Sequence, residues 1–192
     1  MGKRRIVVGL ILMTLVILIA ASCLYIRPSK TLDLNYSKIE WKDKLRQMVE
    51  TRKPELAITE TELNQLAKKE LVQYISNAGL PFEVSGAEFQ LSDDRLLADV
   101  NGAWGALEFG TKVEYTLKYK DGQLILTPDH LSLRDIPVSP DIAGLDSITI
   151  DLTHYFPDFI KIDGVNFPGK SVNIRLSLDW LEISHYLKSL QP

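Results

Sequence analysis

The stretch GVNFPGKS, from Gly164 to Ser171, has the residue types and spacing of a phosphate-binding loop, G-x-x-x-x-G-K-[ST]. Such a loop needs a helix directly after it, because the helix N-terminus faces the phosphates. Here the following residues, VNIRLSL, alternate between apolar and polar as a strand does. Pro168-Gly169 is a turn dipeptide. We therefore predict a β-hairpin, and no nucleotide partner.

A second group of residues could bind a metal ion. Asp151, His154 and Asp158 lie close together in the sequence, and carboxylate and imidazole groups are metal ligands. They surround Pro157 in a predicted loop, however, and no second cluster of ligands accompanies them in a chain with three histidines. We predict no metal site.

A third group suggests nucleophilic catalysis. Asp129, His130 and Ser132 are the residue types of a hydrolase triad. As near neighbours on an extended segment they point in divergent directions, and the chain has no G-x-S-x-G motif. We predict no catalytic residues, no cofactor and no enzyme activity.

Glu70 interrupts the apolar stripe of a predicted helix, either at the edge of the stripe or as a polar contact at the mouth of an apolar groove.

The first thirty residues differ from the rest. Residues 1–5 form a basic tail, and residues 6–26 are 21 residues without a charge. As a helix they would extend roughly 31 Å, the thickness of a bilayer core. We predict a single-pass anchor in the cell membrane, with the N-terminus cytoplasmic and the remaining chain on the extracytoplasmic face.

Cys23 allows an alternative. Small residues precede this single cysteine, as they do in a bacterial lipoprotein signal, so cleavage and lipidation at Cys23 remain open beside the uncleaved anchor. With Cys23 in this segment, the rest of the chain has no disulfide and no thiolate metal site.

The charge of the remaining chain limits its partners. Residues 31–192 contain all 25 Asp and Glu residues, and five of the 22 Lys and Arg residues precede them. The resulting acidic excess, without basic residues interleaved with aromatics, excludes nucleic acid as an expected partner. Residues 27–53 are predicted as a spacer, and residues 54–192 as one α+β domain.

One amphipathic helix is predicted within that domain. Thr59 is a good N-cap and Glu62, three residues later, completes a capping box. Apolar residues then recur at helical spacing up to Gly79, which ends the helix. Shorter helices are predicted from Ser139 to Gly144 and from Asp179 onwards.

The residues from Phe82 onwards alternate with a period of two. The phase slips at Gly86, which indicates a β-bulge. The longest predicted strand, ALEFGTKVEYTLKYK, has an apolar and a charged face, and Asp121-Gly122 after it predicts a hairpin turn. The expected fold is one long amphipathic helix cradled by a twisted, bulged antiparallel sheet, together with the N-terminal transmembrane helix.

Such a half-pipe has an aliphatic and aromatic interior. If this interior is open, it forms an apolar groove in which an acyl chain can lie. If the helix fills the interior, it is an ordinary hydrophobic core. The residues expected to line it are Leu63, Leu66, Leu71, Tyr74, Phe89, Leu107, Phe109, Val113, Tyr115 and Leu117.

Three stretches, ITETELNQL, DGQLILTPDHLSLRDIPVSPDI and HYFPDFIKIDGV, resemble the YpmS-like family of small, anchored extracytoplasmic proteins. The middle stretch is also similar to LmeA-like phospholipid-binding proteins. The resemblance implies a TULIP-like fold, a role in lipid binding and no known catalytic residues. We thus expect a membrane-anchored, non-catalytic protein that holds or transfers a phospholipid or other acyl lipid. The alternative is a structural or protein-interaction domain of the cell envelope with a filled core.

Overall fold

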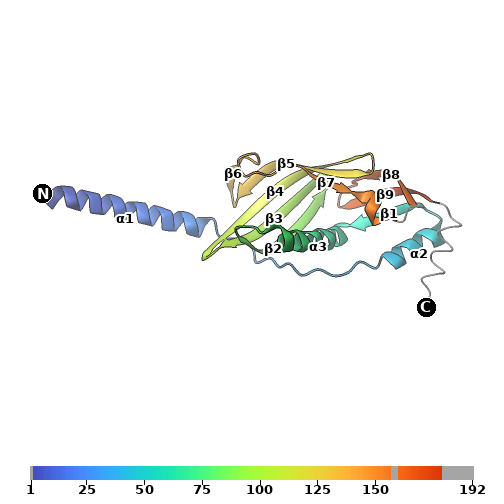
Figure 1. Ribbon diagram of the computed structural model, residues 1–192, viewed down its shortest axis with the longest axis horizontal. Coiled ribbons are helices and arrows are strands. Elements are labelled where there is room, and N and C mark those ends of the chain that lie inside the picture. Colours follow the sequence, from blue (N-terminus) through green and yellow to red (C-terminus); the bar gives the residue numbers. More distant parts are fainter. Residues whose placement is uncertain (1, 157–159, 179–192) are drawn as a thin grey trace.

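The computed structural model describes residues 2–156 and 160–178, which form two antiparallel sheets and three α-helices (Figure 1). The helices are α1 (Gly2–Tyr25), α2 (Trp41–Thr51) and α3 (Glu60–Ala78), with a short 3₁₀ helix, η1 (Leu152–Tyr155). The strands are β1 (Glu55–Thr59), β2 (Glu83–Ser92), β3 (Arg95–Trp104), β4 (Leu107–Lys120), β5 (Gln123–Leu133), β6 (Ile136–Val138), β7 (Ile148–Asp151), β8 (Ile160–Asn166) and β9 (Ser171–Leu178).

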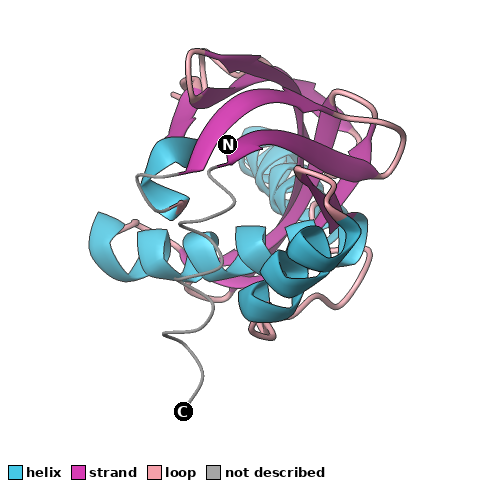
Figure 2. Cartoon of the chain, turned by 90° about the vertical axis from the view of Figure 1, so that its right-hand side faces the viewer, coloured by secondary structure: helices cyan, strands magenta, loops and turns pink. Residues whose placement is uncertain are grey.

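The larger sheet is built from consecutive hairpins. Its order is β2-β3-β4-β5-β6, and β7 pairs with the first half of β5. The bulge predicted at Gly86 is confirmed by a register shift between Val84 and Gly86, and the turn predicted at Asp121-Gly122 joins β4 to β5. Seen from one end, the strands form an arch, with most of the helices along its lower side (Figure 2).

The smaller sheet has the order β1-β9-β8. The hairpin predicted around Pro168-Gly169 is confirmed: β8 and β9 pair antiparallel on either side of it. The phosphate-binding reading of GVNFPGKS is thereby excluded, since the residues after Ser171 form a strand and not a helix. Strand β1 joins this sheet from far away in the sequence, with Glu55 opposite Arg175.

Local signals placed α3 correctly. The Thr59 hydroxyl accepts a hydrogen bond from the Glu62 amide, and the Glu62 carboxylate accepts one from the Thr59 amide at 2.9 Å, which confirms the capping box. Gly79 follows in the left-handed conformation, as expected of a C-cap glycine. The helix predicted from Ser139 to Gly144 is wrong, because those residues form turns. The helix predicted from Asp179 lies outside the described residues.

Helix α3 lies along the edge strand β2 and runs antiparallel to it. The Asn64 side chain accepts a hydrogen bond from the Phe89 amide at 2.9 Å, and Glu60 accepts one from the Leu91 amide at 3.1 Å. The Ala87 amide donates to the Asp33 carbonyl at 3.1 Å. Three alternate amides on the outer edge of β2 therefore have partners from other elements.

The predicted fold class is wrong. In place of one long amphipathic helix cradled by a single sheet, the described chain consists mostly of strands arranged in two sheets, with α3 attached to a sheet edge. The physical reason is that the polar side chains of α3 bond to the edge amides of β2. In addition, residues 55–59, next to the helix, form a strand of the second sheet.

The predicted membrane anchor is also wrong. Among residues 2–156 and 160–178, the structure contains no helix that is both long enough and apolar enough to span a membrane. Residues at the end of the predicted span belong to the folded domain: Arg134 donates a hydrogen bond to the Tyr25 carbonyl, and the Gly110 amide donates to the Ile26 carbonyl at 3.0 Å. The predicted single-pass localisation, which depended on that anchor, is corrected with it.

Candidate functional site

The larger sheet has an inner, mainly apolar face and an outer, mainly charged face. One end of the inner face is closed, since its residues form a single core cluster with the smaller sheet. The smaller sheet contributes Leu56, Ile58, Ile160, Val172, Ile174 and Leu176 to this cluster. The closed end of the inner face consists of Leu91, Leu96, Ala98, Val113, Tyr115, Leu117 and Leu126, all of them buried.

The other end of the same face is open. Alternation along the strands places Val84, Val100, Leu107, Phe109 and Leu133 on the inner side, and Phe82, directly before β2, packs on Phe109. Each of these residues is partly exposed. We call these six residues the open end. Phe82 and Phe109 pack edge to face, with ring centroids 5.6 Å apart. The Phe109 ring also lies over Gly102, where an added Cβ would come within 2.5 Å of it.

Helix α3 extends from the closed end to the open end. Its hydrogen bonds place Glu60 beside Leu91 and Asn64 beside Phe89. A helix rises about 1.5 Å per residue and a strand about 3.3 Å, so Leu71 and Ile75 lie alongside the start of β2. Both are partly exposed, and Tyr74 is 61% exposed. The second half of α3 thus borders the open end with apolar side chains.

The residues predicted to line a groove divide between these two ends. Val113, Tyr115 and Leu117 are buried in the core, and burial raises the pKa of the Tyr115 hydroxyl. Leu63, Leu66 and Phe89 are partly buried against the same core. Leu107 and Phe109 belong to the open end, and Leu71 and Tyr74 lie on the half of α3 beside it. The structure therefore brings part of the predicted set to an exposed surface and places the rest in a filled interior.

Four further residues of the open end, Phe82, Val84, Val100 and Leu133, were not among the predicted groove residues. Their sequence signal was the alternation of apolar and polar residues along the strands, which assigns side chains to one face of the sheet. It had to be continued through the bulge at Gly86, where the register shifts, before Val84 could be assigned to the same face as Phe89.

Tyr155 of η1 is 56% exposed. Burial raises the pKa of the Tyr155 hydroxyl, and the nearby carboxylate of Glu70 raises it further. That carboxylate also forms an ion pair with Lys69 at 3.7 Å. The Glu70 side chain is 45% exposed, so it lies at the surface of α3.

The residues considered for catalysis line a depression of about 540 Å³ on the outer face, at the bulge of β5. Asp129 accepts a hydrogen bond from the Thr116 hydroxyl. His130 lies opposite Glu114 and Ser132 opposite Lys112 in the strand register. The carboxylate is thus bonded to a threonine, and these contacts give no support to a triad.

The residues considered for metal binding have a structural role. Asp151 caps η1 by accepting hydrogen bonds from the Thr153 side chain and amide, which lower the pKa of its carboxyl group. His154 Nδ1 lies 3.1 Å from the Asp151 carboxylate. Asp158 lies outside the described residues. No group of three or more His, Cys, Asp or Glu side chains among the residues described could hold a metal ion.

Comparisons of this chain with protein families, with curated proteins and with solved structures find no match. The resemblance to the YpmS-like family therefore stays a prediction, as does lipidation of Cys23, which is a free, partly exposed cysteine.

Proposed function

We propose that this chain is a non-catalytic binding protein that holds an apolar chain, such as the acyl chain of a lipid, against the open end of the larger sheet. One observation supports the proposal most directly. A single apolar face is buried under the smaller sheet at one end, whereas at the other end six large apolar side chains stay partly exposed.

The chemistry of that surface fits an acyl chain better than a polar ligand. Removing a CH₂ group from water is worth about 0.8 kcal/mol, so a few methylene groups laid along these side chains give useful affinity without a specific polar contact. The two aromatic rings of Phe82 and Phe109 provide a broad contact surface at the centre of the open end.

The location of the site differs from the predicted groove. Since Val113, Tyr115 and Leu117 are enclosed in the core, a ligand would contact the residues nearer the β3–β4 hairpin. Strand positions 100, 107 and 109 are adjacent there, because Trp104 pairs with Leu107 and Gly102 with Phe109. Trp104 itself is 71% exposed at the tip of this hairpin.

A fluorescent fatty acid provides the test, titrated into the full chain. We expect saturable binding, and we expect Phe109→Asp to weaken it by at least about tenfold, equivalent to about 1.4 kcal/mol. Ile142→Asp is the matched control, because Ile142 is an apolar residue that is 85% exposed in the turn after β6 and is not one of the open-end residues.

The competing function, a structural or protein-interaction domain, predicts a different result. If the wild-type chain binds no fatty acid, or if both variants bind it as the wild type does, the open end is not a ligand site. The filled core at the closed end would then favour the interaction domain.

A further inference from the structure

The segment from Ile26 to Asn35, which we call the strap, links α1 to the edge strand β2 across the outer face of the larger sheet. Its carbonyl groups accept hydrogen bonds from three adjacent strands: Gly110 N to Ile26 O at 3.0 Å, Asn101 Nδ2 to Lys30 O at 2.7 Å, and Ala87 N to Asp33 O at 3.1 Å. The strap is therefore docked on the sheet along its length and is not a loose connection.

Two glycines allow the strap to approach the sheet closely. An added Cβ at Gly86 would overlap the backbone carbonyl of Leu32, and one at Gly110 would lie 3.1 Å from the Pro28 Cα. Gly86 sits at the bulge of β2, directly beside Asn101 in the register. The absence of side chains at these two glycines therefore lets the backbone of the strap lie directly against the sheet.

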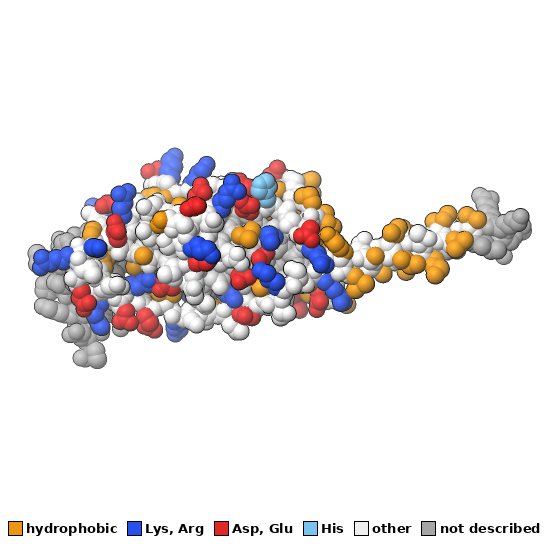
Figure 3. All heavy atoms as spheres, turned by 180° about the vertical axis from the view of Figure 1, so that it is seen from behind, with side chains coloured by type: hydrophobic (Ala, Val, Ile, Leu, Met, Phe, Trp, Pro, Cys, Tyr) orange, Lys and Arg blue, Asp and Glu red, His pale blue; other side chains and the backbone are white. Residues whose placement is uncertain are grey.

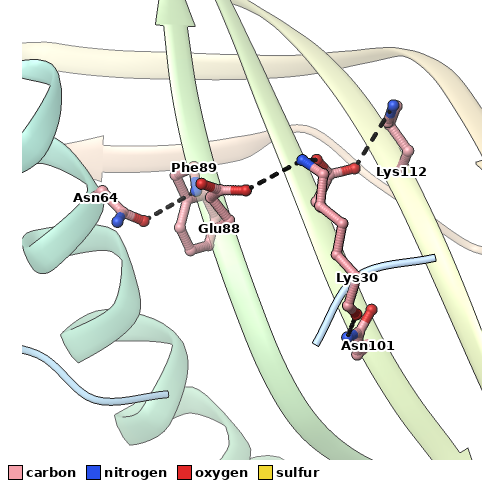
Figure 4. Close-up of polar contacts among 7 residues, drawn as sticks. Lys30, Asn64, Glu88, Phe89, Asn101 and Lys112 are labelled. Atoms are coloured by element: carbon pink, nitrogen blue, oxygen red, sulfur yellow. Dashed lines mark hydrogen bonds and ion pairs between the residues drawn. The ribbon is translucent and has the colours of Figure 1, made fainter. Parts of the chain in front are cut away.

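Two buried polar side chains also bind the strap. Lys68 and Asn101 are the buried polar or charged residues of the described chain, each 7% exposed. The Lys68 ammonium lies 3.2 Å from the Asp33 carboxylate. The Asn101 side-chain amide donates a hydrogen bond to the Lys30 carbonyl, as Figure 4 shows. Without the strap, both groups would lose these partners, which makes a docked strap favourable.

The side chain of Lys30 adds two ion pairs to the contacts of the strap. Lys30 Nζ lies 3.4 Å from Glu88 and 3.7 Å from Asp99, and its side chain is 57% exposed (Figure 4). Such pairs contribute little and are screened by salt. The strap is thus held by main-chain hydrogen bonds and ion pairs, together with the partly buried side chains of Ile26, Pro28, Leu32 and Leu34.

The position of these contacts relates the strap to the open end. Gly110 follows Phe109 in β4, and Asn101 follows Val100 in β3, so the strap bonds to the outer side of the backbone whose inner side carries the open-end residues. The end of α1 is fixed at the same place, where the Arg134 guanidinium lies 4.9 Å from the centre of the Tyr25 ring.

We propose that the strap is a latch. Docked, it holds the open end of the sheet in shape and ties it to α1; released, it lets this end loosen and weakens the binding of an apolar chain. The second half of this statement rests on the proposed function, whereas the first does not.

Amide hydrogen exchange of the full chain, followed by NMR, tests the release. Ala87 and Gly110 donate to the strap, whereas Phe89 and Leu91 on the same edge of β2 donate to α3. A latch predicts that Ala87 and Gly110 exchange at least about tenfold faster than Phe89 and Leu91, and that added salt increases the difference. One common rate for all four amides would mean that the strap opens only with the whole domain, and the latch would be refuted.

The variant Gly86→Ala should displace the strap. We expect it to accelerate exchange at Gly110, two strands away, at least about tenfold, and to leave Leu91 unchanged. Gly164→Ala is the matched control: Gly164 also sits at a strand bulge, and its added Cβ would meet only the end of the Arg175 side chain at 3.1 Å. Gly86→Ala with unchanged exchange at Gly110 would contradict the proposal.

The same variants, titrated with the fluorescent fatty acid, test the link to the site. We expect Gly86→Ala to weaken binding at least about fivefold and Gly164→Ala to leave it unchanged. If Gly86→Ala accelerates amide exchange but leaves fatty-acid binding unchanged, the strap does not control the binding site. If the wild type binds no fatty acid, the proposed function fails, and the exchange rates alone decide whether the strap is a latch.

Discussion

The two ends of the inner sheet face have similar residue types and different environments. Leu117 at the closed end is 4% exposed and touches a core shared with the second sheet, whereas Phe109 at the open end is partly exposed and packs against Phe82. Both belong to the same alternating face of β4. The difference shows that the face alone does not decide whether a residue is core or binding surface; the element packed over it does.

The charged residues follow a separate pattern. Over the view in Figure 3, Lys, Arg, Asp and Glu side chains of both signs are scattered across the body, and hydrophobic side chains gather along α1 and where it meets the body. Because the charged side chains show no single concentrated patch in this view (Figure 3), the difference between the two ends of the apolar face is the more informative one for function. Substitutions at the two ends test this difference.

The largest effect is expected from Leu117→Ala. Truncating a buried leucine leaves a cavity, and such changes cost about 2 to 5 kcal/mol of stability. Urea unfolding followed by circular dichroism measures the loss. A cost below about 1 kcal/mol would mean that the closed end is not a filled core.

A smaller effect is expected from Phe109→Ala. Since the ring is partly exposed, its removal should cost about 1 to 2 kcal/mol, less than the burial of a full phenylalanine would suggest. The same urea experiment gives the value. If Phe109→Ala costs as much as Leu117→Ala, the open end is closed in solution and the distinction between the two ends disappears.

The edge of β2 gives the next test. Asn64→Ala removes the acceptor for the Phe89 amide, and the loss of one such hydrogen bond costs about 0.5 to 1.5 kcal/mol. Asn77→Ala is the control in the same helix, since the Asn77 side chain bonds only to the carbonyl of Gln73 at an exposed position. Equal stabilities of the two variants would argue against α3 as the partner of this edge.

The smallest effect concerns pH. Burial raises the pKa of Glu62, but hydrogen bonds from Lys44 and Thr59 outweigh it, so the net pKa lies below the usual 4.5. A lowered pKa in the folded state contributes stability above pH 4.5 that is lost as the pH falls through the folded value. We expect the melting temperature of Glu62→Gln to fall less steeply than that of the wild type between about pH 5 and 3. Parallel curves would contradict this role.

Local chemistry made several elements predictable. The capping box at Thr59 and Glu62, the turn at Asp121-Gly122 and the bulge at Gly86 depend on neighbouring residues only, and each is found where the sequence placed it. The hairpin around Pro168-Gly169 likewise followed from the strand pattern after Ser171.

The errors arose where distant segments meet. The second sheet forms because β1 pairs with β9, for example Glu55 with Arg175. The residues next to Glu55 and Arg175 give no indication that these two distant segments pair. That sheet decides which of the predicted groove residues are core. The strap was also missed, because an irregular segment bound through its carbonyl groups has no periodicity to detect.

The three alternate amides of β2 bound by Asp33, Asn64 and Glu60 have a consequence for the behaviour of the chain at high concentration. Free amides on an edge strand invite pairing with a strand of another molecule, which leads to aggregation. Over this stretch the edge already has partners from the strap and from α3. Release of the strap would uncover the Ala87 amide first, so conditions that loosen it should also promote self-association along β2.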